Sequence, residues 1–500
     1  MRPKILLGLV ALAALRFAFF AADDAYATDD AWISFRVARN LLEHGALTYD
    51  LARPPVEGMT NLLWTLLSTT WTAALPGLDP LVVAQLLGGL AHLCTVGLAG
   101  LVAAELAGGA GSARDSGKAS NTSSAGTLAA GAAAALLALS GSLAFYAASG
   151  METALDGLFF LLAVRGALRA MNGRASAGGG AALALLAASR PEGVLAGGLI
   201  CLWVLRERRD RPVLLRLVAP FVLAVCALEA FRLFYYGSLV PNTFHAKPGV
   251  LRDGFAALRD WWLDGLGLIG PLAAVPLLAR SRRARGLALL VAVLAAGVVW
   301  SGGDWMPGYR RFVPAMIGFA LLAGAGVEAA QGRVRLAAAA AVLAALGGSV
   351  VATALHRDGR RVQTAIFEAA GRAAQLTPGV RDVALVDIGR FGYAYRGSIF
   401  DLGALTDAHL ARLPGPHLKK AWDSAYFAAR HPDLVLLLDR GSEGVLQPER
   451  AVEADVLGSM RDLGDYLLRA RIPMVGGTHL LVFSRRRLVL PDALWGPRPE

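Results

Sequence analysis

Long apolar segments fill most of this chain and restrict what it can fold into. They recur from residue 5 to about residue 355, after which the composition becomes that of a soluble domain. A content of 55% hydrophobic residues and a mean hydropathy of +0.50 over 500 residues are too high for an ordinary soluble protein. Because a helix of about 20 apolar residues crosses a bilayer, the sequence predicts a polytopic α-helical membrane protein.

The apolar segments predict about eleven membrane spans, followed by a separate domain. We expect a transmembrane domain at 1–355 and a small soluble α/β domain at 356–500. The candidate spans are 5–22, 61–76, 81–108, 126–148, 153–170, 178–205, 212–236, 266–280, 286–302, 311–330 and 335–355.

The C-terminal segment has the pattern of an α/β domain, with strand-like runs alternating with helical stretches. Residues 387–392 lack the GxGxxG spacing of a phosphate-binding loop, so no nucleotide site is expected there. The runs that resemble strands are Val383–Ile388, Leu434–Leu438 and His479–Phe483, and the helical stretches lie near 361–375, 417–430 and 449–470.

The net charge of +11 comes from short basic clusters between apolar segments. Clusters at 206–211 and 280–285 fit the positive-inside rule, so no nucleic-acid partner is expected. The loop with Asp29 and the C-terminal domain then share the opposite side. Simple counting, however, places Glu152 with the basic clusters. A helix break at 190–193 would repair half of this conflict.

Two adjacent carboxylates, Asp29 and Asp30, begin an amphipathic segment expected to lie as a helix on the membrane surface. Either acid could accept a proton or bind a metal, and Asp29 could instead cap its own helix. Adjacent helical side chains diverge by about 100°, so the pair cannot easily chelate one ion. We predict that Asp29 is the base. Asp30, through a divalent metal (Mg, Mn or Ca), would orient a donor phosphate, or the roles are reversed.

Further polar residues are expected on the same side as this acidic pair. Glu57 precedes the second apolar segment and has no capping role there, so we take it as a third catalytic candidate. Basic residues favour phosphate recognition, although each could be an ordinary interface residue. The candidates for the donor phosphate are His245, Lys247, Arg310, Arg311 and Arg190, and the other candidates are Arg36, Glu152 and Asp304.

Six motifs, in order along the chain, resemble bacterial GT-C glycosyltransferases, in particular the group that includes the terminal arabinofuranosyltransferase of the mycobacterial cell wall. Residues 387–393 and 400–407 continue the resemblance into the C-terminal domain. Each motif alone is weak, whereas six in matching order are fairly specific. The motifs lie at 29–40, 56–64, 149–155, 189–193, 241–247 and 302–312.

The resemblance implies an inverting enzyme of the bacterial inner membrane with a periplasmic site and C-terminal domain. Its donor would be a polyprenyl-phosphate sugar and its acceptor a periplasmic glycan, lipid or protein. The acids carried over are Asp29 and Asp30, with Glu57 nearby, and Glu152 and Arg190 would face the periplasm. The sugar and acceptor vary across the family. The alternative is a membrane transporter or lipid flippase, which would also have intramembrane charges and broken helices.

Overall fold

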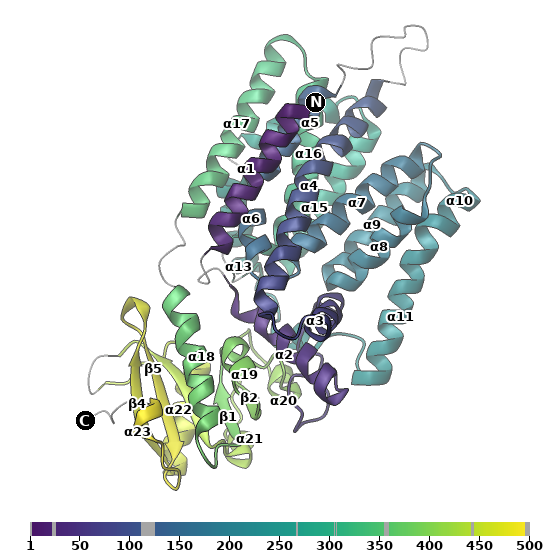
Figure 1. Cartoon of the computed structure of the whole chain (residues 1–500). Coiled ribbons are helices and arrows are strands. Elements are labelled where there is room, and N and C mark those ends of the chain that lie inside the picture. Colours follow the sequence, from purple (N-terminus) through teal and green to yellow (C-terminus); the bar gives the residue numbers. More distant parts are fainter. Residues whose placement is uncertain are drawn as a thin grey trace.

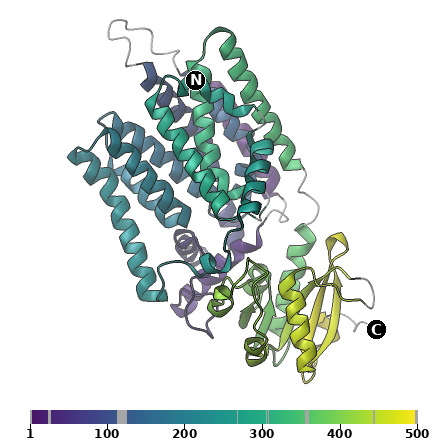
Figure 2. The same cartoon turned by 180° about the vertical axis from the view of Figure 1, so that it is seen from behind.

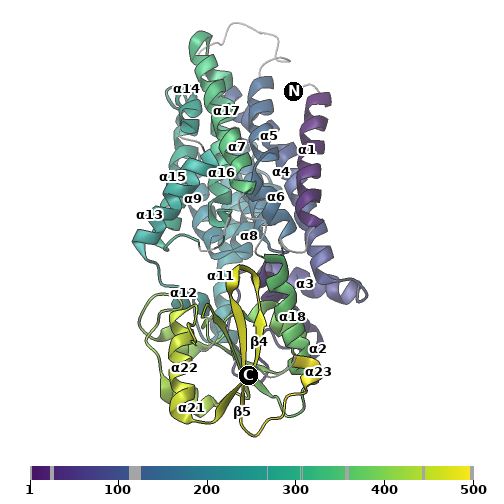
Figure 3. The ribbon, with the colours of Figure 1, turned by 90° about the vertical axis from the view of Figure 1, so that its left-hand side faces the viewer.

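The computed structural model has two parts, a helical bundle and a C-terminal sheet domain at one end of it (Figures 1 and 3). Figure 2 shows the same arrangement from behind. Trp305 and Pro307 of the 302–312 motif lie outside the described residues. The described residues are 3–22, 27–111, 126–266, 269–304, 306, 308–354, 360–441 and 445–495.

Apolar helices form the bundle, and its shorter helical turns connect them. The long or bundled helices are α1 (Pro3–Ala21), α4 (Pro80–Gly111), α5 (Thr127–Ala138), α6 (Gly141–Ala148), α7 (Thr153–Met171), α8 (Ala177–Ser189), α9 (Pro191–Glu207), α11 (Ala219–Tyr236), α13 (Leu251–Asp260), α15 (Arg282–Trp300), α16 (Val313–Ala329) and α17 (Gly332–Ala354). The short elements are α10 (Arg211–Val213), η2 (Leu214–Val218), η3 (Trp261–Leu266), η4 (Gly270–Ala274), α14 (Val275–Leu278) and η5 (Arg310–Phe312).

The protein is a multi-pass membrane protein. Within the described residues, five helices are long and apolar enough to cross a bilayer, or up to seven if each bent helix pair is one span. The segment 61–76, expected to span, forms α3 (Leu62–Ala74). Its 13 residues rise about 20 Å, which is too short for a hydrocarbon core of about 30 Å. The segment 178–205 is two helices, which meet at Arg190.

The two ends of the bundle carry different charges. At one end, Arg283 bonds Asn172 at 2.7 Å and pairs with Glu207 at 3.4 Å, so the ends of α7 and α9 meet the start of α15 and its basic cluster. Glu152 and Arg190 lie at the other end, beside the C-terminal domain. The counting conflict disappears, because α3 does not span and the chain turns back between α8 and α9.

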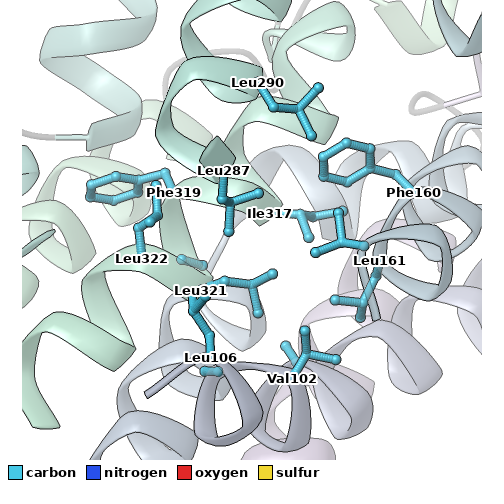
Figure 4. Packing of buried hydrophobic residues seen from close by; sticks show 14 of the residues in the cluster. Val102, Leu106, Phe160, Leu161, Leu287, Leu290, Ile317, Phe319, Leu321 and Leu322 are labelled. Atoms are coloured by element: carbon cyan, nitrogen blue, oxygen red, sulfur yellow. The ribbon is translucent and has the colours of Figure 1, made fainter. Parts of the chain in front are cut away.

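Small and branched apolar side chains fill the bundle interior (Figure 4). Leu287, Ile317 and Leu321 are fully buried, as are Phe160 and Leu161 of α7. Helices α4, α7, α15 and α16 therefore share one core, and this core holds the helix ends that carry the polar residues in fixed positions.

The C-terminal domain contains a five-stranded sheet with the order β2-β1-β3-β5-β4. Strands β1, β2 and β3 are parallel, whereas β5 is antiparallel to β3 and β4. The sequence patterns identified β1, β3 and β5 but not β2 or β4. The elements are α18 (Arg360–Leu376), β1 (Asp382–Leu385), α19 (Ile388–Ala394), β2 (Ser398–Asp401), α20 (Ala408–Arg412), α21 (Ser424–Arg430), β3 (Leu434–Asp439), α22 (Ala451–Leu463), β4 (Tyr466–Pro473), η6 (Val475–Gly477), β5 (His479–Arg485) and α23 (Asp492–Trp495).

Helix α2 (Asp29–His44) lies between the bundle and the C-terminal domain. Nine of the sixteen residues of α2 are buried, and these include Arg36 and Asn40 of its polar face. Its Ile33 and Val37 share one apolar cluster with Ile388 and Phe391 of α19. Helix α2 is therefore part of the core of the C-terminal domain.

The polar face of α2 is bound by backbone groups of the domain. Arg36, only 2% exposed, donates to the carbonyls of Tyr49 (2.9 Å), Gly392 (2.6 Å), Tyr395 (2.7 Å) and Gly397 (2.7 Å). A buried guanidinium needs such partners, because an unpaired buried charge is very costly. The three bonds to Gly392, Tyr395 and Gly397 fix the C-terminal domain against α2, and the bond to Tyr49 holds the segment that follows α2.

Asp29 makes the second polar contact between α2 and α19. Its carboxylate accepts hydrogen bonds from the backbone N–H of Gly389 at 2.8 Å and of Arg390 at 2.7 Å. It does not cap its own helix, whose N-cap is Thr28. A Cβ on Gly389 would lie 1.9 Å from the carbonyl oxygen of Asp29, so only glycine allows this approach.

We predict that Arg36→Met frees the C-terminal domain from α2. Each lost charged hydrogen bond contributes about 1.5–3 kcal/mol, so docking weakens by roughly 3 kcal/mol or more. Hydrogen exchange of residues 388–395 in purified protein measures the loss of protection. The exposed Arg252 provides the control variant Arg252→Met, which should behave as wild type. Unchanged protection in Arg36→Met would show that the docking does not depend on these bonds.

A second prediction concerns pH. Burial, with the nearby charge of Asp387, raises the pKa of Asp29 from 3.8 to about 7. Between these values the folded state holds a proton that the unfolded state has lost, so the stability contribution of Asp29 falls as pH rises and is level above about 7. The melting temperature of Asp29→Asn, measured relative to that of wild type, should therefore rise as the pH is raised from 4 to 7. The opposite trend would mean that Asp29 is ionised throughout.

Candidate active site

One cavity of about 870 Å³ lies where the bundle meets the C-terminal domain. Its walls combine apolar side chains of the bundle with a dense set of charges from both parts. The apolar residues include Leu186, Leu195, Leu239, Leu294, Val298 and Trp300. The charged residues predicted from the sequence that line it are Asp29, Asp30, Glu152, Arg190, Lys247, Asp304, Arg310 and Arg311.

Asp30 and Lys247 are opposite charges on this wall. Burial lowers the pKa of Lys247, and the carboxylate of Asp30 acts against that shift. Lys247 follows the short helix α12 (Asn242–Ala246). Asn242 fixes this helix by donating to the carbonyls of Ala404 (3.0 Å) and Leu405 (2.9 Å) in the C-terminal domain. The domain therefore positions the ammonium group.

Arg190 lies at the break between α8 and α9, where Pro191 begins the new helix. It forms an ion pair with Glu152 and a second one with Glu192 at 3.4 Å. Glu152 also accepts a hydrogen bond from Asn61 at 2.7 Å. Arg190 is therefore neutralised by two carboxylates, those of Glu152 and Glu192.

Arg310 and Arg311 enter the cavity from the turn before α16. Arg310 pairs with Asp304 at 3.0 Å. Arg311 pairs with Glu192 at 2.8 Å and donates to the carbonyl of Gly303 at 2.9 Å. Each guanidinium is thereby fixed in direction before any ligand arrives, and its remaining N–H groups can bind oxygen atoms of a phosphate.

Three predicted residues lie away from the cavity wall. Glu57 is buried and pairs with Arg232 at 3.0 Å, and this pair joins the loop before α3 to α11. The carbonyl of His245 accepts from Lys420 at 3.0 Å, and its ring stands beside Phe244. Arg36 has the docking contacts described above. These residues hold the surrounding chain in place.

The role of Asp30 as a metal ligand stays a prediction. In the described part of the chain, no group of three or more His, Cys, Asp or Glu side chains could hold a metal ion. Asp30 acts instead on a cation, Lys247. Mg²⁺ is usually bound by one or two carboxylates together with water and substrate phosphates, so the predicted site would consist of Asp30 and the donor phosphate.

The cavity also contains residues of the C-terminal domain that were not predicted as site residues. Asp387, His417 and Arg450 line it from the side opposite the bundle. Asp387 begins the motif at 387–393, which was noted only for its overall resemblance. Nothing in the local sequence around His417 or Arg450 indicates a site, because only the folded sheet brings them to the cavity.

Comparisons with known proteins identify relatives by fold. Residues 354–483 match a family model described as a domain of unknown function, DUF8728. No curated protein matches the sequence.

Solved structures match nearly the whole chain. ArnT from Cupriavidus metallidurans bound to undecaprenyl phosphate superposes with a TM-score of 0.61 and 13% identity over 100% of both chains. Its apo form gives a TM-score of 0.60 at 14% identity over 98% of this chain and 99% of that chain. The Archaeoglobus fulgidus oligosaccharyltransferase in its apo form gives 0.51 at 12% identity over 80% of this chain and 64% of that chain. This chain therefore has the GT-C fold.

Proposed function

We propose that this protein is a glycosyltransferase that moves a sugar from a polyprenyl-phosphate carrier to an acceptor in the periplasm. The carrier's phosphate would bind among Lys247, Arg310 and Arg311, and its chain would lie along the apolar wall. Similar proteins support this proposal: one ArnT structure contains undecaprenyl phosphate. The observation that carries the proposal is one cavity in which Asp30 and these cations adjoin an apolar surface.

Asp30, rather than Asp29, is the proposed base. Both oxygens of Asp29 already accept backbone hydrogen bonds from α19. Asp30 lines the cavity beside Lys247, where a donor phosphate and an acceptor hydroxyl would meet. This reverses the preferred assignment from the sequence and keeps the alternative that was left open there.

The transfer step needs a base and a stabilised leaving group. The acceptor hydroxyl oxygen forms a bond to the anomeric carbon, and its proton passes to the Asp30 carboxylate. The bond between that carbon and the phosphate oxygen breaks, and its electron pair stays on the phosphate. Lys247, Arg310 and Arg311 stabilise the additional negative charge, the electrostatic contribution expected to be largest in such reactions.

The orientation in the membrane follows the charges. The clusters at 206–211 and 280–285 lie at the bundle end away from the C-terminal domain, so the positive-inside rule assigns that end to the cytoplasm. The cavity and the C-terminal domain are then periplasmic in a bacterial inner membrane. This supports a lipid-linked donor, because nucleotide sugars are made in the cytoplasm.

The two aspartates can be separated by substitution. We predict that Asp30→Asn lowers transfer by roughly 100-fold or more, the scale of lost general-base catalysis, and leaves folding unchanged. Asp29→Asn keeps one oxygen for α19 and should retain transfer within about tenfold. Transfer to acceptor from a polyprenyl-phosphate sugar is measured in nanodiscs. Full activity of Asp30→Asn would reject this assignment, and loss in Asp29→Asn alone would restore the reverse one.

The proposed binding of a lipid-linked donor can be tested by substituting Lys247. Replacing it by Met should weaken undecaprenyl-phosphate binding by roughly tenfold to 100-fold, because a charged hydrogen bond contributes about 1.5–3 kcal/mol. The exposed Lys419, outside the cavity, gives the control Lys419→Met. Turnover of a nucleotide sugar without lipid would contradict the proposal. Movement of intact carrier across the membrane, with no release of polyprenyl phosphate, would instead support the transporter or flippase alternative.

A further inference from the structure

The C-terminal domain presents the carboxyl ends of its parallel strands to the cavity. Asp387 lies two residues after the end of β1, and Gly403 and Leu405 follow β2. All three residues line the cavity. The strand order β2-β1-β3 means that the chain leaves β1 toward one side and reaches β3 on the other. In open α/β sheets, this switch point at the carboxyl ends is the usual ligand site.

A pair of opposite charges lies at this edge. Asp387 and Arg450 are 2.9 Å apart, and their side chains are 22% and 21% exposed. Arg450 stands at the start of α22, after β3, so the pair crosses the switch point between β1 and β3. Both side chains are oriented by each other, and both line the cavity.

His417 adds a neutral polar group to the same wall. Burial, with the charge of Lys247, lowers its pKa to about 3, so the imidazole is uncharged at neutral pH. Among the described residues, its buried Nδ1 has no hydrogen-bond partner. The His417 ring also donates a hydrogen bond to the backbone carbonyl of Ala246. Because a neutral imidazole has one N–H donor and one acceptor nitrogen, the remaining nitrogen can accept a hydrogen bond from a hydroxyl group.

This wall adjoins the proposed reaction site in two places. The charge of Asp387 acts on Asp29, which precedes the proposed base, and the charge of Lys247 acts on His417. A molecule held on this wall would therefore reach the region between Asp30 and Lys247. Asp387 and Arg450 compensate each other's charge, and His417 is uncharged at neutral pH, so the wall they form has no net charge to hold a phosphorylated acceptor.

We propose that Asp387, His417 and Arg450 form the acceptor subsite, and that the acceptor is a neutral, hydroxyl-rich carbohydrate. Asp387 and the free ring nitrogen of His417 accept hydrogen bonds from hydroxyls, and Arg450 donates to hydroxyl and ring oxygens. This inference rests on the proposed glycosyl transfer and names the acceptor class for it. The C-terminal domain is then a substrate-binding part of the enzyme.

The test measures binding of acceptor and carrier separately on the full chain in nanodiscs. The acceptor probe is the neutral fraction of oligosaccharides released by mild acid from the envelope of the producing cell, and the carrier probe is undecaprenyl phosphate. The variants are His417→Ala and Asp387→Asn. The control is His409→Ala, which changes a histidine of the same domain that pairs with Asp423 away from the cavity.

Wild type and His409→Ala should retain the neutral oligosaccharides, and both site variants should bind them at least tenfold more weakly. Undecaprenyl-phosphate binding should stay within twofold in all four proteins. Unchanged oligosaccharide binding in both site variants would overturn the subsite and leave the proposed donor intact. Failure of the wild type to bind the neutral oligosaccharides, with undecaprenyl-phosphate binding intact, would overturn the acceptor class. If the wild-type protein does not bind undecaprenyl phosphate, the proposed function itself is refuted.

Discussion

The docking of α19 onto α2 is the contact on which the rest of the structure depends. Arg36 is buried with its charge, and it stays there because four backbone carbonyls surround it. The Asp29 carboxylate accepts hydrogen bonds from the backbone N–H groups of Gly389 and Arg390. Gly389 has no side chain, which allows α19 to approach α2 closely. This contact closes the cavity, because α2 carries Asp30 on one wall and the domain supplies the other.

Ion pairs set the polar groups of the bundle wall in place. Arg190, Arg310 and Arg311 each have a carboxylate partner, from Glu152, Glu192 or Asp304. Such pairs balance the cost of burying charge, and they also fix the direction of each guanidinium. A site arranged in advance needs little rearrangement when charge develops on a leaving phosphate. The charge of Asp30 acts on Lys247 and also on Arg310.

The sequence predicted the fold class because apolar segments and motif order extend over almost the whole chain. It placed Asp30, Lys247, Arg190, Arg310 and Arg311 on one side, and all of them line one cavity. Amphipathic periodicity predicted α2 correctly as a helix, but it could not tell a membrane surface from a protein surface. A membrane surface and a protein surface can each cover the apolar face of a helix. Only the folded domain shows that backbone carbonyls bind the polar face of α2.

Other features depend on contacts distant in sequence. The helix at 61–76 is apolar enough to span, but it ends after 13 residues and lies beside α2. Strand β2 was missed because it has only four residues with polar ones at both ends, and β4 was missed because its first residues fell in the helical stretch predicted near 449–470. The local sequence gives no structural role to Glu57, but Glu57 forms an ion pair with Arg232, which is distant along the chain. Likewise, His417 reaches the cavity only through the sheet's topology.

The central claim is that the phosphate of a lipid carrier binds in the cavity between Asp30 and Lys247. The most direct measurement is a structure of the protein in lipid nanodiscs with a polyprenyl phosphate added. Density for a phosphate within hydrogen-bonding distance of Lys247, with its chain along Leu294 and Val298, is the result expected here. Density for the phosphate outside this cavity, with Asp30 and Lys247 closed on each other, would contradict the account.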